Sequence, residues 1–237
     1  MDEFAAYLGS FGPIETLARS RIEKVVARTM AANASAIPHV THHDLVDVTA
    51  LETYRRDLSP EERISPLIFI IKAVVSALRA FPRFNASLSP DGESLILKQY
   101  CHIGIAVDGP LGLLVPVLRD CDAKDLPALA QELRDFSKQA REKGLSGAQM
   151  SGGCFTISSL GGIGGEYFTP IINAPEVAIL GVCGLRTCPQ WDGHSFVARE
   201  MLPLSLSYDH RIINGADAAR FVNHIGQALI DLVPSEG

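Results

Sequence analysis

The sequence predicts a single α/β domain with a mixed β-sheet, over residues 17–237. Apolar residues follow a helical repeat in some segments and short β-rich runs in others, and the two kinds of segment are mixed along the chain. Both hairpin-type turns and longer crossovers connect them, which is typical of a sheet with parallel and antiparallel strands. Hydrophobic residues make up 47% of the 237 positions, enough to build a substantial core.

Residues 1–16 are predicted to form an arm outside this core. Glycine and proline between residues 9 and 13 interrupt any apolar repeat. The aromatic side chains Phe4, Tyr7 and Phe11 are free to dock on another surface.

A capping box predicts where the first helix begins. Ser20 and Glu23 have the spacing at which the two side chains bond free backbone amides of a helix start. Residues 37–48 alternate enough to form a strand. A second capping box is predicted at residues 49–52, opening a short helix.

Two further helices have clear start and stop signals. Ser65 followed by Pro66 suits a cap and the first helical position, and this helix, apolar nearly all round, should be buried and end before Pro82. Residues 125–143 form an amphipathic pattern closed by Gly144.

The remaining segments are predicted as short strands and one helix. Turn signals at residues 89–92 and 108–112 separate pairs of short runs. Strands are expected at residues 155–158, 177–182 and 201–208, and a last helix at residues 216–233.

Composition argues against several classes of function. Charged residues make up 20% and the net charge is −6, which disfavours a nucleic-acid surface. The N-terminus lacks the pattern of a signal peptide, and the most apolar run, residues 66–78, contains Lys72 and is too short for a membrane. Five cysteines without a Cys-x-x-Cys pair favour free thiols. We expect a cytoplasmic protein, or a mitochondrial matrix protein if the source is a eukaryote.

The strongest candidate for chemistry is His210, within the segment Asp-His-Arg-Ile-Ile-Asn-Gly at residues 209–215. It follows the predicted strand 201–208, and a strand end holds a reactive side chain rigidly. Imidazole has the unperturbed pKa closest to neutral, so it suits a general base. The alternative is an ordinary surface histidine in a turn.

Other clusters carry weaker signals. His39, His42 and His43 lack companion ligands at metal spacing, so we predict no metal site. The glycines at 161–165 fit neither a dinucleotide loop nor a P-loop. Ser158 is not in a nucleophile elbow, and the adjacent serine should face the opposite side of the strand.

Three long motifs in order resemble the dihydrolipoamide acyltransferases, the core proteins of the 2-oxo acid dehydrogenase complexes. That family's signature is Asp-His-Arg, two apolar residues, Asp or Asn, then Gly, and residues 205–221 match it closely. The second match covers residues 154–165 and 168–182, and the third covers residues 102–108 and 112–117. The resemblance extends from about Phe11 to about Leu232.

The resemblance implies a two-layer fold like that of chloramphenicol acetyltransferase, and acyl transfer between a dihydrolipoyl thiol and coenzyme A. It assigns the base to His210 and the oxyanion donor to Ser158, and adds Asn214 to the catalytic set. Asp209, Arg211 and Gly215 would hold the turn. Asparagine at position 214 resembles the pyruvate branch of the family, which transfers acetyl groups.

The resemblance also implies partners. The expected assembly is a homotrimer whose site lies between subunits, alone or within a larger cage, although residues 231–237 are more polar than the apolar end of cage-forming members. Neither a lipoyl domain nor a peripheral subunit-binding domain is recognised. The lipoyl group would then come from another domain or chain, and the 2-oxo acid dehydrogenase and dihydrolipoamide dehydrogenase components would be partners. No metal, nucleic acid or membrane is expected.

Two alternatives belong to other classes. One is a non-catalytic subunit that only builds the core, which the presence of His210 disfavours. The other is an acetyltransferase acting on a small hydroxyl compound, which the lipoyl-type motifs outside the histidine turn disfavour.

Overall fold

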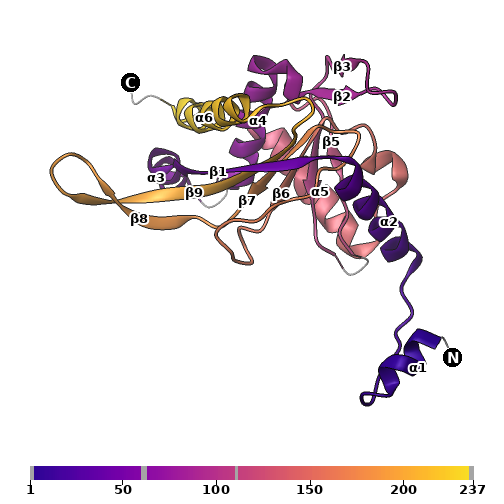
Figure 1. Ribbon diagram of the computed structural model, residues 1–237. Helices are drawn as coiled ribbons and strands as arrows, with labels where there is room; N and C mark the ends of the chain where they lie inside the picture. The colour runs from indigo at the N-terminus through magenta and orange to yellow at the C-terminus, as the bar shows by residue number, and fades with distance from the viewer. Residues whose placement is uncertain (1–2, 60–62, 110–111, 235–237) are drawn as a thin grey trace.

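A seven-stranded mixed sheet forms the centre of the molecule in the computed structural model, which describes residues 3–59, 63–109 and 112–234 (Figure 1). The strand order is β1-β9-β7-β6-β4-β5, and β8 pairs with β9 off this path. Strands β4, β6 and β7 are mutually parallel, and the other pairs are antiparallel, so the predicted mixed sheet is confirmed. The strands are β1 (His39–Asp47), β4 (Ile103–Ala106), β5 (Val117–Leu118), β6 (Phe155–Ser159), β7 (Ala178–Val182), β8 (Arg186–Trp191) and β9 (Phe196–Asp209).

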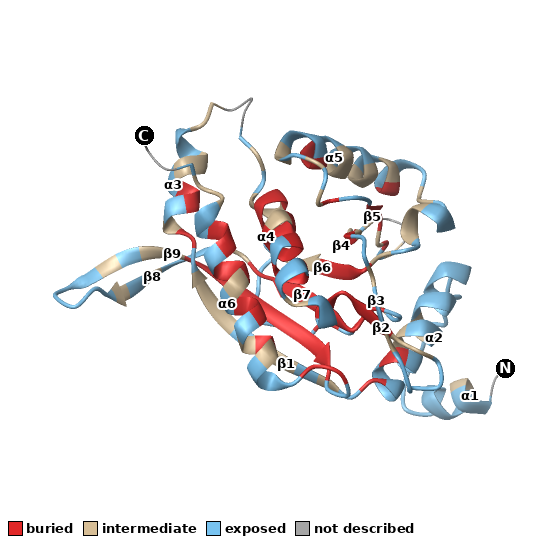
Figure 2. Cartoon of the chain, turned by 90° about the horizontal axis from the view of Figure 1, so that it is seen from above, coloured by how far each residue is buried: buried red, intermediate tan, exposed pale blue. Residues whose placement is uncertain are grey.

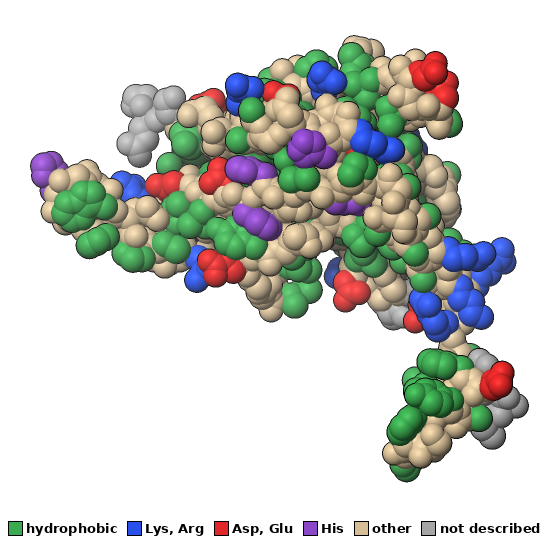
Figure 3. All heavy atoms as spheres, viewed as in Figure 1, with side chains coloured by type: hydrophobic (Ala, Val, Ile, Leu, Met, Phe, Trp, Pro, Cys, Tyr) green, Lys and Arg blue, Asp and Glu red, His purple; other side chains and the backbone are tan. Residues whose placement is uncertain are grey.

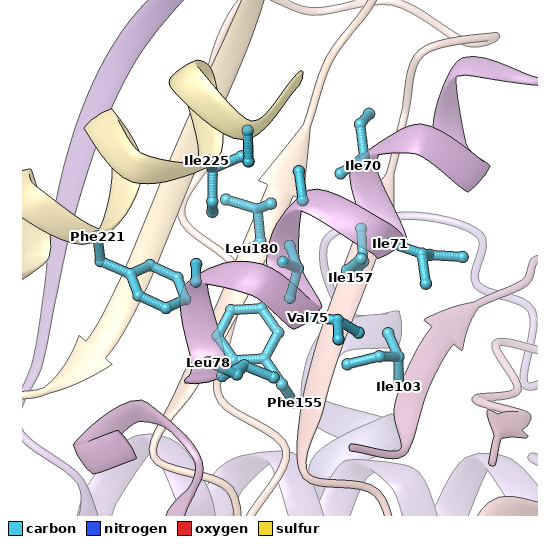
Figure 4. Close-up of a cluster of buried hydrophobic side chains, with 14 of the residues drawn as sticks. Ile70, Ile71, Val75, Leu78, Ile103, Phe155, Ile157, Leu180, Phe221 and Ile225 are labelled. Atoms are coloured by element: carbon cyan, nitrogen blue, oxygen red, sulfur yellow. The ribbon is translucent and has the colours of Figure 1, made fainter. Parts of the chain in front are cut away.

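Helices cover one face of the sheet and make the second layer. The helices α4 (Pro66–Ala80) and α6 (Gly215–Asp231) pack against each other, and α6 also contacts β1 and β9. Their buried residues line the side toward the sheet (Figure 2). Side chains such as Val75, Ile157 and Phe221 interdigitate between the layers (Figure 4). The helices α3 (Thr49–Asp57) and α5 (Leu126–Glu142) flank this pair.

Most predicted helix starts are confirmed, and one is wrong. The Ser20–Glu23 capping box opens α2 (Arg21–Ala36), and the Ser65 hydroxyl caps α4. At α3, however, Val48 is the cap residue and no side chain caps the helix. The Thr49 hydroxyl donates instead to Asp47 Oδ1 at 2.6 Å and accepts the backbone N–H of Glu200 at 2.9 Å. The Asp47 carboxylate and the backbone of strand β9 therefore bind the Thr49 hydroxyl, so this hydroxyl does not cap the helix.

The N-terminal arm contains a helix that the sequence did not predict. Helix α1 (Glu3–Gly9) has no buried residues and lies away from the body at the end of an extended segment (Figure 1). Tyr7 and Phe11 pack edge to face at 5.2 Å, yet both are mostly exposed. Apolar side chains gather over α1, and Lys and Arg side chains gather near the start of α2 (Figure 3). Residues 3–16 of the arm thus bury no side chain in the core of their own chain.

The long hairpin of β8 and β9 is the main element missing from the sequence prediction. Strand β9 has 14 residues and begins at Phe196, five residues before the predicted start, and β8 pairs with this added part. The hairpin projects from the body (Figure 1). Strand β8 alternates between exposed and half-buried residues, so it has no continuous apolar run by which the sequence would predict a strand.

Smaller elements complete the chain. The strands β2 (Ala86–Leu88) and β3 (Leu95–Leu97) form a separate hairpin across the predicted turn at residues 89–92. Short 3-10 helices are η1 (Pro82–Phe84) and η2 (Gly147–Met150). Part of the expected turn at 108–112 and the end of the polar tail lie outside the described residues. Among the helices described, none is long and apolar enough to cross a membrane, and all five cysteines are free.

Candidate active site

The face of the sheet away from α4 is lined by buried polar side chains. Ser205, Ser207 and Asp209 alternate along β9 with core residues and are at most 3% exposed. The Ser207 hydroxyl bonds Thr41 at 2.8 Å, and the Ser205 hydroxyl bonds His43 Nδ1 at 2.9 Å. This polar face, formed by β1, β9, β7 and β6, carries the candidate residues.

The turn that follows β9 is fixed by the Asp209 carboxylate. Its oxygens accept from Arg211 Nε at 2.9 Å and Nη2 at 2.6 Å, and Oδ1 also accepts the Arg211 backbone N–H at 3.0 Å. This pairing raises the pKa of the Arg211 guanidinium. The Asp209 carbonyl accepts the N–H groups of Ile212 and Ile213. Asp209 and Arg211 therefore hold this turn, and their support of an active site stays a prediction.

His210 lies at the tip of this turn with its ring exposed. Its backbone N–H donates to the Pro38 carbonyl at 3.1 Å, and its ring lies 5.8 Å from that of Tyr208. Within the described residues, neither ring nitrogen has a hydrogen bond. The backbone is thus held firmly while the imidazole remains available to a substrate.

Asn214 and Gly215 open helix α6. The Asn214 side-chain oxygen accepts the Asp217 backbone N–H at 2.9 Å, as an N-cap residue does, and Gly215 is the first helical residue. The Asn214 amide group makes no hydrogen bond as a donor in the described part of the chain. Capping fixes the side chain and leaves its NH₂ group free to donate.

Ser158 and Ser159 face opposite sides of β6, as expected. The side chain of Ile157 is buried in the core under α4, so Ser158 lies on the polar face. Ser159 lines a cavity of about 300 Å³ together with Ser65 and Leu67 at the start of α4. Only Ser158 therefore shares a face with the row of polar residues on β9.

Phe168 is a neighbour of Ser158 that the sequence did not single out. Gly181 pairs with Ser158 across β6 and β7, and a Cβ on Gly181 would lie 2.7 Å from the Phe168 ring. The ring thus covers the glycine beside Ser158, and only a glycine leaves room for it. Gly181, a glycine at the centre of a predicted strand, was the sequence feature that could have indicated this close contact.

The register of the sheet separates His210 from Ser158 within one chain. Ser158 is opposite Gly181, which is opposite Ser205, and His210 follows five residues later. At about 3.3 Å per residue, this places the backbones of the two residues roughly 16 Å apart along the strand direction. General base catalysis requires contact at about 3 Å. One subunit therefore cannot bring both residues to the same substrate atom.

Two of the three histidines of β1, His39 and His43, have structural partners. His39 Nδ1 bonds the Ile37 carbonyl at 2.8 Å, while Nε2 accepts the Ile172 backbone N–H at 3.0 Å. No group of three potential metal ligands occurs among the residues that the structure describes. At residues 161–165, Gly164 and Gly165 have φ angles of 138° and 92°, which only glycine adopts readily, so this segment is a tight turn after Ser158.

The chain resembles a well-defined family of enzymes. A family model for the catalytic domain of the 2-oxoacid dehydrogenase acyltransferases matches residues 12–233. The dihydrolipoyllysine-residue acetyltransferase component of the pyruvate dehydrogenase complex from Cupriavidus necator is 53% identical over 93% of this chain and 40% of that protein. The corresponding component from Bacillus subtilis is 40% identical over 90% of this chain and 49% of that protein. The chain thus spans less than half the length of these relatives.

Comparison with solved structures indicates the same family. The dihydrolipoamide acetyltransferase of Azotobacter vinelandii superposes with a TM-score of 0.92 at 47% identity, covering 95% of both chains. The cubic core of a pyruvate dehydrogenase multienzyme complex gives the same values. A chloramphenicol acetyltransferase superposes with a TM-score of 0.58 at 16% identity, over 85% of this chain and 94% of that one. The last comparison confirms the predicted fold alone.

Proposed function

The chain belongs to the 2-oxoacid dehydrogenase acyltransferase family, and from this we propose that it transfers an acetyl group between a dihydrolipoyl thiol and coenzyme A. Both substrates are thiols, and the carbonyl carbon passes from one sulfur to the other. Such a reaction requires a base for the attacking thiol and a donor for the oxyanion. His210 and Ser158 have the chemistry for these two roles.

The steps follow from these two groups. His210 takes the proton of the coenzyme A thiol, and the thiolate attacks the carbonyl carbon of the S-acetyl-dihydrolipoyl thioester. The Ser158 hydroxyl donates to the oxyanion of the tetrahedral intermediate. The C–S bond to the dihydrolipoyl group then breaks, and its sulfur receives the proton from His210. A thiol with a pKa near 8.5 is within reach of a neutral imidazole.

The structural study of the Azotobacter vinelandii enzyme supports this assignment. That study addressed the role of one serine, one histidine and one asparagine in the catalytic mechanism of the enzyme. These three residues have the same spacing along that chain as Ser158, His210 and Asn214 have here. We assign Asn214 to the site as a donor through its free NH₂ group.

The observation that carries the proposal furthest is the separation of His210 from Ser158 in one chain. A working site then needs His210 from one subunit and Ser158 from the next, which a closed homotrimer supplies three times. The exposed aromatic residues Phe4, Tyr7 and Phe11 of the arm have apolar surface to bury on such a neighbour. The trimer would stand alone or form part of a larger cage like the related cubic core.

The proposed reaction also implies the other substrates and the partner proteins. Coenzyme A is a substrate, and the lipoyl group is supplied by another domain or chain. The 2-oxo acid dehydrogenase and dihydrolipoamide dehydrogenase components are the proposed partners. The reaction as written requires no metal.

Mixed trimers test both the reaction and the shared site. Acetyl transfer from acetyl-coenzyme A to free dihydrolipoamide is measured for the wild type, for His210→Ala, for Ser158→Ala, and for the two variants after subunit exchange. Each variant alone should be nearly inactive, and mixtures should recover activity, because some interfaces combine an intact histidine with an intact serine. No transfer by the wild type would refute the function. Inactive mixtures, with exchange confirmed by mass spectrometry, would refute the shared site.

A further inference from the structure

A row of four residues crosses the polar face at the level of Ser158. Ser158 on β6 lies opposite Gly181 on β7. Gly181 lies opposite Ser205 on β9, which lies opposite His43 on β1. Neighbouring strands are about 4.8 Å apart, so Gly181 is the first neighbour of Ser158 on this side. Because glycine has no side chain, the group that lies over Gly181 forms the wall beside the Ser158 hydroxyl.

The Phe168 ring forms that wall. Its Cζ, Cε1 and Cε2 atoms lie 2.7, 2.9 and 3.3 Å from the position that a Cβ on Gly181 would take. The end of the ring therefore occupies the place of the missing side chain, next to Ser158. Phe168 is half-buried, so part of its surface is accessible to a bound group.

Contacts with the far end of the row hold the ring in place. The Phe168 backbone N–H donates to the Ser205 hydroxyl at 3.5 Å, and this buried hydroxyl also bonds His43 Nδ1 at 2.9 Å. The ring of the preceding residue, Tyr167, lies 5.0 Å from that of His43. The segment that carries Phe168 is thus attached to both β9 and β1, which fixes the ring relative to Ser158.

The other sides of Ser158 differ from the side that Phe168 closes. Two residues earlier on β6, the Thr156 hydroxyl donates to the buried Glu176 carboxyl at 2.9 Å, so the polar face is filled in that direction. On β4, Ala106 lies opposite Ser158 and has only a methyl group to place there. The long coenzyme A and dihydrolipoyl arms need the less enclosed side, whereas a short acyl group fits on the enclosed side.

We propose that Phe168 is the specificity-determining residue for the acyl group: its ring, fixed over Gly181, leaves room beside Ser158 for an acetyl group and excludes longer acyl chains. This inference rests on the proposed acyl transfer. An oxyanion donor lies about 3 Å from the oxygen that it binds, so the acyl carbons lie about one strand spacing from Ser158. Each further methylene then extends toward the ring, and misfits of this size change rates by about 10–200-fold.

Donors of different acyl length test the role of the ring. Transfer to free dihydrolipoamide is measured with acetyl-, propionyl- and butyryl-coenzyme A, and kcat/KM is compared between the donors. The wild type should use butyryl-coenzyme A at least about tenfold less well than acetyl-coenzyme A. Phe168→Ala opens the space over Gly181 and should raise the butyryl-to-acetyl ratio at least about tenfold.

Two matched variants separate size selection from a general loss of structure. Tyr167→Ala removes the neighbouring ring and leaves the space over Gly181 filled, so the butyryl-to-acetyl ratio should change much less. Ala106→Val narrows the opposite side and should raise KM for all three donors without changing the ratio. A ratio that falls in Ala106→Val would place the acyl group against β4 and overturn the inference.

The outcomes distinguish the inference from the proposed function. A wild type that transfers none of the three acyl groups would refute the proposed function, and the inference with it. A wild type that transfers acetyl and butyryl groups equally well, or an unchanged ratio in Phe168→Ala, would overturn the inference alone. If Phe168→Ala does not fold, Phe168→Leu shortens the same wall, and the same ratio decides.

Discussion

The two ends of the polar face differ in how they hold their functional residue. At the end of β9, Asp209 binds Arg211 through both carboxylate oxygens, so the backbone around His210 is fixed by several charge-assisted bonds. At the end of β6, Ser158 is followed by a glycine-rich turn and is bordered by the Phe168 ring. One end is built on polar bonds, and the other on close packing.

This difference agrees with the roles that the proposed function gives to each end. A base must keep its orientation while it gains and loses a proton, and a turn fixed by an ion pair provides that. An oxyanion donor must hold its hydroxyl in one place, and the close packing of Phe168 on Gly181 provides that. Under the proposed function, each subunit contributes two unlike half-sites, because the two ends lie far apart in one chain.

Loss of the imidazole should have the largest effect. His210→Ala removes the base, and we expect acetyl transfer to fall by about 10³-fold, within the range for general bases. Folding and assembly should be unchanged, because no side-chain bond of the ring holds the turn. Steady-state assays and sedimentation check both points, and near-normal turnover would refute the role of the base.

Ser158→Ala should have the next largest effect, at the other end. Loss of one oxyanion donor should lower kcat by about 10²–10³-fold with little change in KM. Ser159→Ala is the matched control, because that hydroxyl faces α4, and its kcat should change much less. If the control loses more activity than Ser158→Ala, the wrong hydroxyl has been assigned.

Glu176→Gln should change how stability depends on pH. Burial raises the pKa of Glu176 from 4.5 to about 7, so the folded protein binds a proton that the unfolded chain releases. Its contribution to stability is complete below pH 4.5 and is lost as the pH rises through 7. Glutamine has no such loss, so the variant should gain up to about 3 kcal/mol relative to the wild type between pH 5 and pH 8. Urea unfolding at several pH values measures the difference, and parallel curves would contradict the burial argument.

Arg211→Gln should have a smaller effect, at the fixed end. The Asp209 carboxylate stays buried and loses the guanidinium, which should reduce the free energy of unfolding by about 2 kcal/mol. Arg211→Lys keeps the charge without the paired geometry and should lose less. Gly162→Ala, in the glycine-rich turn, should be nearly neutral, since no atom lies within 4 Å of the added Cβ. Equal losses in these variants would remove the contrast between the two ends.

The sequence predicted local features where the signal is itself local. The Ser20 capping box, the Ser65–Pro66 helix start and the buried α4 are confirmed, because each depends on residues within a few positions of one another. The Thr49 prediction is wrong because Asp47 and strand β9, which is distant in sequence, compete for the threonine hydroxyl. The β8 strand was missed because its stability comes from pairing with β9 and not from an apolar pattern of its own.

By itself, the sequence determined the mixed α/β fold, the family and the identity of the candidate groups, because apolar periodicity, capping residues and long motifs are properties of the chain order. Only the tertiary structure decided how those groups are arranged. The register of β6, β7 and β9 places His210 and Ser158 at opposite ends of one face, and packing places Phe168 over Gly181, beside Ser158. Strand register and burial result from contacts between segments that are distant in sequence, and therefore no local pattern contains them.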